Sequence, residues 1–376
     1  MYRQVLHEIG TLLDRRNPPI ILILGLRQVG KSTLAKAACI NRPSVFFNFD
    51  LISDIAEFTG RDRHNLALFA SRYKDHVIVV DEIQKSPDAT GIVKHLHDTY
   101  NLPFLLTGSS ELKIRAGVGD SLAGRLREIR LYPLSLKEID TQQNMAFDSG
   151  SEFTHYEFNQ QMLLRTLVYG SLPQLQNIPE ADYAGYLRGL VNALLSRDIL
   201  ELSAVRKPAQ VYHLARLLAL QIGQLVNFNE LAENTGLSRA SVVNFIEIFE
   251  QMGLVTRAHP LSTNRRESIT KRTKVYFTDP GMRNCLINDF SPIDQRADKG
   301  QLLENAVYMG ISRSLDYAGE PYELGFFRSD YGAEIDIVKK VAGKEELFEV
   351  KAGKRVTRKR SDVTYITIDD AQRYLY

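Results

Sequence analysis

One short stretch near the start of the chain constrains its fold more than any other. The apolar, β-branched run Pro19–Leu24 predicts a strand that is buried on both faces, as in parallel sheets. Directly after it stands G-x-x-x-x-G-K-S-T, Gly25–Thr33, and then the helical stretch Leu34–Cys39. A glycine-rich turn at a helix N-terminus points backbone N–H groups at phosphate oxygens. The pattern therefore predicts a phosphate-binding loop.

The residues of this loop have separate expected roles. Lys31 can reach the β- and γ-phosphates of a nucleoside triphosphate, and the Ser32 hydroxyl can ligate Mg²⁺. The alternative is a glycine-rich turn with a structural role alone. The residues expected to hold the nucleotide are Gly25, Leu26, Arg27, Gln28, Val29, Gly30, Lys31, Ser32 and Thr33.

A second buried run ends in two acids. His76–Val80 predicts another strand, and Asp81 and Glu82 follow it directly. The carboxyl ends of strands form the ligand-binding edge of an α/β sheet. We expect Asp81 to hold Mg²⁺ through water and Glu82 to polarise the attacking water as a general base. The alternative is that the two acids only solvate the end of the strand.

Two further runs, Ser44–Asp50 and Pro103–Thr107, predict strands of the same sheet. The alternation of strands and helices predicts a parallel, right-handed α/β arrangement. A polar residue at the end of the second of these strands could sense the γ-phosphate. The candidates are Thr107 and Ser109.

An arginine soon after this strand could reach a phosphate on a neighbouring subunit. Arginine supplies fixed, planar positive charge where charge develops in the transition state. Arg125 is the candidate and Arg115 is its alternative. Such a role implies a homo-oligomer. The alternative is a surface arginine or an intramolecular ion pair.

Five motifs in this order resemble a prokaryotic family of AAA+-like ATPases with a C-terminal domain of unknown function. The motifs are Gly25–Thr33, Val80–Gln84, Leu106–Ser110, Ser121–Arg125 and Tyr132–Leu134. The resemblance implies ATP as the nucleotide, and the sequence has no guanine-selecting Asn-Lys-x-Asp. In related ATPases a lid element contacts the adenine, and Tyr169–Pro173 resembles it. Gly170 and Pro173 are therefore expected at the nucleotide, unless the element is only a turn.

The middle of the chain predicts helices. The polar stretch 141–152 predicts a linker, and apolar residues at helical spacing across 156–220 predict a lid over the nucleotide. A helix-turn-helix is predicted over Phe228–Ser238 and Arg239–Met252. Gly236 would lie in the turn, and Ser238 would be the N-cap of the second helix. A basic hairpin after it completes a predicted winged helix.

The predicted hairpin suits contact with the phosphates of DNA in a sequence-independent way. Its basic residues are Arg265, Arg266, Lys271, Arg272 and Lys274. The second helix presents Glu247 and Glu250 outward, and these carboxylates argue against strong base reading by that helix. The alternative is a scaffold or a protein-contact module.

The C-terminal part carries a constellation that resembles the PD-(D/E)XK nucleases. Glu304 lies on a predicted helix, Asp336 on a strand, and Glu349 and Lys351 on one face of the next strand. The three carboxylates could bind one or two Mg²⁺ ions, with Asp336 and Glu349 as ligands, and Lys351 could orient water. The stretch after Lys351 is short for that superfamily, so the alternative is a remnant or a binding module.

Composition sets limits on the partners. The two cysteines, Cys39 and Cys285, make neither a disulfide framework nor a metal-ligand set, so a cytoplasmic setting is expected. No apolar run approaches the ~18 residues that span a bilayer, so no membrane partner is expected. The formal net charge is only +2, so any surface for DNA must come from local clustering.

Together these patterns predict an α/β protein. It has a parallel P-loop ATPase sheet with a helical lid, then a winged helix-turn-helix and a small α+β nuclease-like domain. The expected boundaries are 1–145, 150–220, 221–290 and 296–376.

The predicted function is an ATP hydrolase that acts on or with DNA, with Mg²⁺-dependent DNA cleavage as a second activity. One alternative is a nucleotide-locked regulatory switch whose C-terminal parts bind partners without cleavage. Another is a DNA-binding module that does not cleave.

Overall fold

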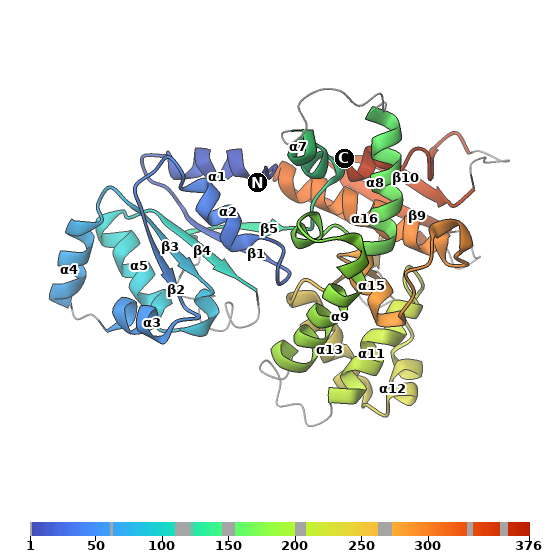
Figure 1. The fold of residues 1–376 in the computed structure, drawn as a ribbon, viewed down its shortest axis with the longest axis horizontal. Coiled ribbons are helices and arrows are strands. Elements are labelled where there is room, and N and C mark those ends of the chain that lie inside the picture. Colours follow the sequence, from blue (N-terminus) through green and yellow to red (C-terminus); the bar gives the residue numbers. More distant parts are fainter. Residues whose placement is uncertain are drawn as a thin grey trace. The chain divides into compact units, whose positions relative to one another are not determined.

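The computed structural model describes residues 2–60, 63–109, 122, 124–144, 155–199, 208–261, 273–328, 334–353 and 360–376. The chain forms two compact units (Figure 1). The first comprises Met1–Tyr132 with Gln251–Gly253, and the second comprises Pro133–Glu250 with Leu254–Tyr376. The N-terminal segment of the first unit therefore ends at Tyr132, before residue 145, where the sequence predicted the end of the ATPase core.

The described residues of the first unit contain a five-stranded parallel sheet, as predicted. Its strand order is β2-β3-β4-β1-β5. The strands are β1 (Ile20–Gly25), β2 (Ser44–Asn48), β3 (Val77–Asp81), β4 (Phe104–Gly108) and β5 (Leu126–Leu131). Because the strands are parallel, the carboxyl ends of β1, β3 and β4 meet at one edge.

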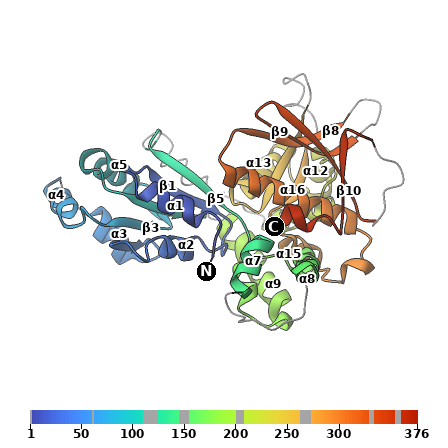
Figure 2. The same ribbon diagram turned by 90° about the horizontal axis from the view of Figure 1, so that it is seen from above.

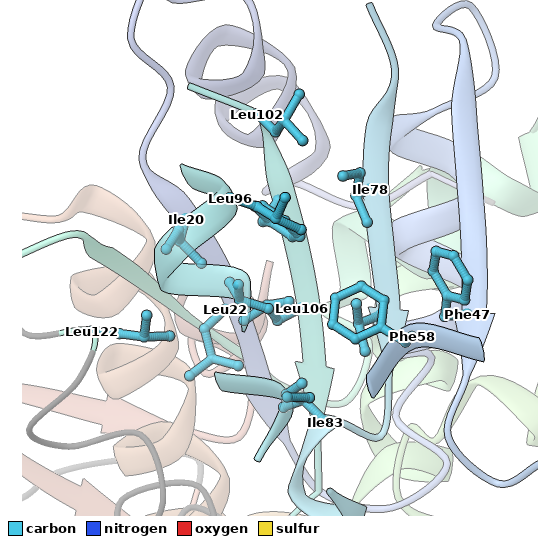
Figure 3. Close-up of a cluster of buried hydrophobic side chains, with 14 of the residues drawn as sticks. Ile20, Leu22, Phe47, Phe58, Ile78, Ile83, Leu96, Leu102, Leu106 and Leu122 are labelled. Atoms are coloured by element: carbon cyan, nitrogen blue, oxygen red, sulfur yellow. The ribbon is translucent and has the colours of Figure 1, made fainter. Parts of the chain in front are cut away.

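Alternating strand residues and the helices that follow the strands build the core of this unit. Figure 3 shows Ile20, Leu22 and Leu106 of the sheet packed with Leu96 and Phe58. Successive side chains of a strand point to opposite faces of the sheet, so residues two apart, such as Ile20 and Leu22, lie on the same face. The helices are α1 (Leu6–Leu13), α2 (Lys31–Ala38), α3 (Ile52–Thr59), α4 (Arg63–Arg72) and α5 (Ala89–Tyr100), with a 3₁₀ turn η1 (Ile83–Lys85).

Helices make up the first half of the second unit. They are α7 (Leu136–Asn144), α8 (His155–Tyr169), α9 (Tyr183–Ala193), the π-helical turn η4 (Leu194–Asp198), α11 (Pro208–Leu220), α12 (Phe228–Thr235) and α13 (Arg239–Gln251). Later come α15 (Pro280–Ile287), α16 (Lys299–Ala318) and α17 (Gln372–Leu375). Short 3₁₀ turns lie at η2 (Pro173–Gln176), η3 (Glu180–Asp182) and η5 (Ile293–Gln295). Helix α15 packs against α8, α9 and α11 and is the centre of this bundle.

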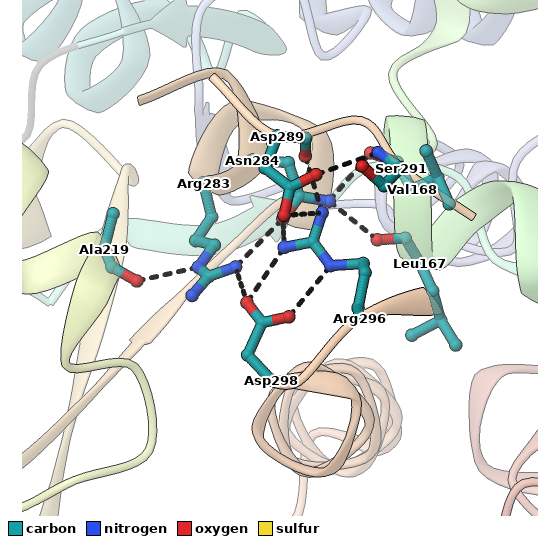
Figure 4. Close-up of polar contacts among 9 residues, drawn as sticks. All are labelled: Leu167, Val168, Ala219, Arg283, Asn284, Asp289, Ser291, Arg296 and Asp298. Carbon is teal, nitrogen blue, oxygen red and sulfur yellow. Dashed lines mark hydrogen bonds and ion pairs between the residues drawn. The ribbon is translucent and has the colours of Figure 1, made fainter. Parts of the chain in front are cut away.

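A buried polar network ties these helices together (Figure 4). Arg283 on α15 donates to the carbonyl of Ala219 at 2.7 Å, and Asn284 donates to two carbonyls in the last turn of α8 at 2.9 and 2.8 Å. Arg283 and Arg296 both pair with Asp298. Buried charges are tolerated when each has such a partner, so the network fixes how the helices pack.

The described part of the second unit also contains a six-stranded sheet of order β11-β10-β9-β8-β6-β7. The strands are β6 (Val255–Pro260), β7 (Lys274–Phe277), β8 (Tyr322–Arg328), β9 (Glu334–Val341), β10 (Lys344–Lys351) and β11 (Val363–Thr367). Helix α16 packs against β10 (Figure 2). Among the described residues of this sheet, β6 pairs with β8 and β10 pairs with β11 in parallel, and the other neighbouring strands are antiparallel.

The junction between β6 and β8 joins strands that the sequence placed in separate domains. His259 pairs with Gly325, and Pro260 pairs with Phe326. A Cβ atom at Gly325 would lie 2.1 Å from the carbonyl oxygen of His259, so only glycine fits this approach. Residues of the predicted ranges 221–290 and 296–376 thus share one continuous sheet.

Across the described stretches of the chain, the helices lack the length and apolar character that a membrane span needs.

Candidate functional site

The predicted phosphate-binding loop lies between β1 and α2, as its sequence context required. Gly25 closes β1 with φ of 154°, and a Cβ atom there would lie 2.4 Å from the Leu131 carbonyl oxygen. Gly30 has φ of 97° and immediately precedes the first residue of α2. Both conformations favour glycine, which explains why the loop carries glycine at these two positions.

Lys31 lies against the loop from which it projects. Its Nζ donates to the carbonyl oxygens of Gly25 at 2.9 Å and Leu26 at 3.0 Å, and the side chain is buried. Gln28 also takes a positive φ, of 61°. The ammonium group is thus held at the loop, where phosphates bind in proteins of this local geometry.

Asp81, the last residue of β3, accepts hydrogen bonds from side chains of α2 and β4 at the carboxyl edge of the sheet. Ser32 Oγ, at the start of α2, donates to Asp81 Oδ1 at 2.9 Å. Thr107 Oγ1, near the end of β4, donates to the same oxygen. Hard oxygen donors of this kind suit Mg²⁺, so Ser32 and Asp81 fit the ion that accompanies a nucleotide.

Glu82 contacts three neighbouring side chains, one of which, Thr107, also contacts Asp81. Its Oε2 accepts hydrogen bonds from Ser109 Oγ at 3.0 Å and from Gln84 Nε2, and its N–H donates to Thr107 Oγ1 at 3.2 Å. Its φ of 58° is uncommon for a residue with a side chain and costs on the order of 1 kcal/mol. The two alternatives for the sensor residue, Thr107 and Ser109, therefore both contact an acid of the pair. The contact made by Gln84 was not predicted.

Helices α12 and α13 of the second unit lie where the sequence predicted a helix-turn-helix. Gly236, with φ of 67°, ends α12, and Ser238 Oγ accepts from the N–H of Ser241 at 3.1 Å and caps α13. Glu247 and Glu250 do not stand free, because both pair with Arg257 of β6, at 3.7 and 2.7 Å.

A bridge between Leu225 and Lys274 adds a third extended segment beside β6 and β7. A winged helix over these elements stays a prediction. The predicted phosphate-contacting residues Arg265, Arg266, Lys271 and Arg272 lie outside the described residues.

The prediction that Lys274 contacts DNA is wrong. Its side chain is 2% exposed, and its Nζ lies 3.1 Å from Glu304 Oε1 and 2.9 Å from Glu334 Oε1. Two carboxylates neutralise this ammonium inside the protein, so it is not available to a phosphate.

The four residues of the predicted nuclease constellation lie in one neighbourhood. Burial raises the pKa of both Glu304 and Asp336, and Lys274 opposes the rise at each. Asp336 Oδ2 accepts the N–H of Val350 at 2.8 Å, and Glu349 pairs with Lys351 at 2.5 Å. Burial would lower the pKa of Lys351, but Glu349 and Asp336 raise it.

These carboxylates do not fit a Mg²⁺ ion as the predicted constellation requires. An ammonium group lies between Glu304 and Glu334, and Glu349 is engaged by Lys351. Within the described ranges, no group of three or more His, Cys, Asp and Glu side chains could hold a metal ion. The roles of Lys274 and Glu334 were not predicted from the sequence.

The geometry of the first unit agrees with a comparison of the chain with protein-family models. Residues 17–140 match an AAA domain. They cover the loop, Asp81, Glu82 and Thr107, and they form a P-loop domain of the AAA type. Residues 160–292 match a domain of unknown function (DUF8612), and residues 299–373 match another (DUF4143).

Relatives of this chain exist in bacteria and archaea. An uncharacterized protein of Mycobacterium tuberculosis is 24% identical over an alignment of 339 positions that covers 89% of this chain and 70% of the relative. One of Methanocaldococcus jannaschii is 21% identical over an alignment of 380 positions that covers 93% of this chain and 79% of the relative. A Walker-type ATPase structure from Pyrococcus abyssi aligns with 16% identity and a TM-score of 0.45, covering 74% of this chain and 94% of that one.

Arg125 lies in the AAA domain in an ion pair with Asp98, its Nε 2.6 Å from Asp98 Oδ1. This contact agrees with the alternative that the sequence left open, an intramolecular ion pair. An arginine finger at this position would have to leave Asp98, so that role stays a prediction. The alternative candidate, Arg115, lies outside the described residues.

The element expected at the adenine is buried within the second unit. Gly170 has φ of 77°, and a Cβ atom there would lie 2.0 Å from a carboxylate oxygen of Asp279. The N–H of Ser171 donates to Asp279 Oδ2 at 2.8 Å. Gly170 and Pro173 are both buried, and their expected place at the nucleotide stays a prediction.

Proposed function

We propose that the AAA domain binds ATP with Mg²⁺ and hydrolyses it. The observation that carries this proposal is the convergence of Ser32 and Thr107 on Asp81, beside Glu82 and a loop that holds Lys31. Backbone N–H groups and Lys31 would bind the phosphates, and Ser32 and Asp81 would hold the metal. Bound Mg²⁺ neutralises charge on the phosphates.

Glu82 would act on the attacking water. The water oxygen attacks the γ-phosphorus, the bond to the β–γ bridging oxygen breaks, and ADP leaves with that oxygen. The proton released by the water passes to the Glu82 carboxylate. Ser109 and Gln84 hold this carboxylate in one position, which is what a general base needs.

Phosphate release by the full chain tests the proposal. Glu82→Gln should bind ATP and lose hydrolysis by roughly 10²-fold or more, because the amide cannot accept the proton. Glu57→Gln is the matched control, since Glu57 is an exposed residue of α3 in the same unit. Equal turnover in Glu82→Gln and the unaltered chain would refute the assignment.

We also propose that α12 and α13 form a helix-turn-helix and that the chain works with DNA. The basic residues Arg265, Arg266, Lys271 and Arg272 would contact phosphates. No DNA cleavage is part of this function, because Glu304 and Glu349, two of the three predicted metal-binding carboxylates, pair with lysines.

Salt-dependent DNA binding tests this second proposal. Replacing the four basic residues by glutamine should weaken binding to all sequences. The slope of log K against log salt should become shallower by about 0.9 for each phosphate that the variant no longer neutralises. Lys339→Gln with Lys340→Gln is the control, since these lysines pair with Glu346 and Glu345. Absence of DNA binding, with ADP retained after purification, would favour the nucleotide-locked switch.

A further inference from the structure

Strand β2 forms one edge of the parallel sheet in the first unit, with β3 as its neighbour. The Phe49 N–H donates to the Asp81 carbonyl at 3.0 Å, and the Val77 N–H donates to the Pro43 carbonyl at 2.9 Å. Backbone groups of successive strand residues point to opposite sides of the strand, so odd-numbered residues here face β3. The residues of β2 whose backbone groups face outward are Ser44, Phe46 and Asn48.

The chain itself covers only one end of this edge. The Asn48 N–H donates to Asp54 Oδ2 at 2.8 Å, and the Asn48 carbonyl accepts the Leu51 N–H at 2.9 Å. In the described part of the chain, no hydrogen bond reaches the outward N–H and C=O groups of Ser44 and Phe46. Free backbone groups along a sheet edge are a template for another strand.

Large apolar side chains are exposed along the same edge. Ile40 before β2 is 77% exposed, Phe46 on β2 is 41% exposed, and Leu51 and Ile52 after it are 52% and 84% exposed. Phe47 points into the core of the unit (Figure 3), so Phe46 lies on the opposite face of the sheet. A gathering of exposed apolar side chains marks an interaction surface.

The free backbone groups of this edge match those of a second copy of the same edge. Two β2 strands can lie antiparallel about a two-fold axis through Val45. Ser44 of each copy then stands opposite Phe46 of the other, and each such pair exchanges both of its N–H to C=O hydrogen bonds. Every free donor at the edge thus finds a free acceptor, and the two Val45 residues form the close pair between them.

The same axis also brings unlike ends of β2 together. Ile40 of each copy reaches the end of the strand after which Leu51 and Ile52 of the other copy lie. Arg42 and Asp50, which carry opposite charges, approach each other there as well. The ends are therefore complementary in charge and alike in apolar character, as a contact between identical surfaces requires.

We propose that the β2 edge binds the β2 edge of a second copy of this chain, antiparallel and centred on Val45. The contact would join two parallel sheets into one and cover the apolar side chains of Ile40, Phe46, Leu51 and Ile52. A two-fold contact uses the same surface on both copies, so it closes with two chains and builds no filament. The proposal does not depend on ATP hydrolysis.

Sedimentation velocity of the full chain across a micromolar concentration series tests the proposal. The unaltered chain should form a dimer. Phe46→Lys should raise the dissociation constant roughly 10-fold or more, because the contact would bury an ammonium group without a partner. Ile52→Lys should act in the same direction and alters the most exposed of these side chains. Leu220→Lys is the matched control, an exposed leucine of the second unit, and should leave the dimer unchanged.

Cysteine cross-linking tests the register of the contact. Val45→Cys should form a disulfide between two chains under mild oxidation, because the Cα atoms of such a close pair lie about 4.5 Å apart. Phe46→Cys should not, because the two copies of residue 46 would lie diagonally, about 7–8 Å apart.

Three results would overturn the proposal. The first is an unaltered chain that stays monomeric throughout the concentration series. The second is a dimer that folded Phe46→Lys and folded Ile52→Lys both leave unchanged, because the two chains would then meet elsewhere. The third is a dimer in which Phe46→Cys cross-links and Val45→Cys does not, because the two strands would then pair in another register.

Discussion

Asp81 accepts two hydroxyl hydrogen bonds, one from Ser32 at the start of α2 and one from Thr107 on β4. The donors stand 49 and 26 positions away along the chain, so folding alone brings them together. A carboxylate held from two sides needs little rearrangement when a cation and phosphates arrive. We therefore expect ATP hydrolysis to be most sensitive to single substitutions at Asp81, Ser32 and Thr107.

Thr107→Val removes one hydroxyl and keeps the shape of the side chain. We expect ATP hydrolysis to fall roughly 10- to 100-fold while ATP binding is retained, because Asp81 loses a donor and the Glu82 N–H loses its acceptor. Phosphate release and nucleotide binding measured side by side check this. Thr90→Val is the control, since its hydroxyl bonds the Pro87 carbonyl instead. Unchanged turnover in Thr107→Val would contradict the role of this contact.

Sequence reasoning located the loop, Asp81 and Glu82 because their positions follow from local pattern at strand ends. Gln84 was not predicted, since its contact with Glu82 depends on the left-handed turn at Glu82. Lys274 was misjudged for a related reason. It stands at the end of a basic run in the sequence, but its pairing in β7 turns it into the protein.

At the scale of elements, α15 organises the helices of the second unit. Asp279 begins it as N-cap, accepting from the N–H of Met282 at 3.1 Å and from that of Ser171 at 2.8 Å. Its carboxylate is buried, and burial raises its pKa to about 6 in spite of these hydrogen bonds. A charge in this position links the stability of the element to pH.

Because the pKa of Asp279 is higher in the folded chain than in the unfolded chain, its contribution to stability is lost as the pH rises. The folded chain holds the Asp279 proton up to about pH 6, whereas the unfolded chain releases it near the ordinary pKa of 3.8. This contribution to stability is complete below about pH 4 and is lost as the pH rises to about 6. The loss amounts to about 3 kcal/mol.

Urea unfolding followed by circular dichroism between pH 4 and 7 measures this contribution. In Asp279→Asn the decline across that window should shrink, because the amide does not titrate. Asp294→Asn, an exposed residue of η5, serves as control and should keep the decline. Parallel curves for the unaltered chain and Asp279→Asn would contradict the account of this helix.

At the scale of the molecule, each unit has its own sheet, and the sheets differ in how far sequence reasoning could predict them. The parallel sheet of the AAA domain follows from buried runs alternating with helices. The second sheet does not, because β6 and β8 belong to regions that the sequence separates, and their approach depends on glycine at position 325. Pairing of distant strands leaves no local pattern to detect.

Gly325→Ala tests whether these regions act as one sheet. Its Cβ would lie 2.1 Å from the His259 carbonyl oxygen, so β6 and β8 must separate. Hydrogen exchange of both strands should become faster, as mass spectrometry of their peptides would show. Gly300→Ala has its nearest neighbour at 3.8 Å and should leave exchange unchanged. Faster exchange in β8 alone would mean that the two regions are independent.

The central claim is that the loop Gly25–Thr33 takes up ATP with Mg²⁺. Calorimetric titration of the nucleotide-free chain with ATP and Mg²⁺ tests it most directly. The account predicts saturable uptake of one ATP per chain by the unaltered protein and by Lys36→Ala, an exposed neighbour on α2, and no uptake by Lys31→Ala. Absence of binding in the unaltered chain, or equal affinity in Lys31→Ala, would contradict it.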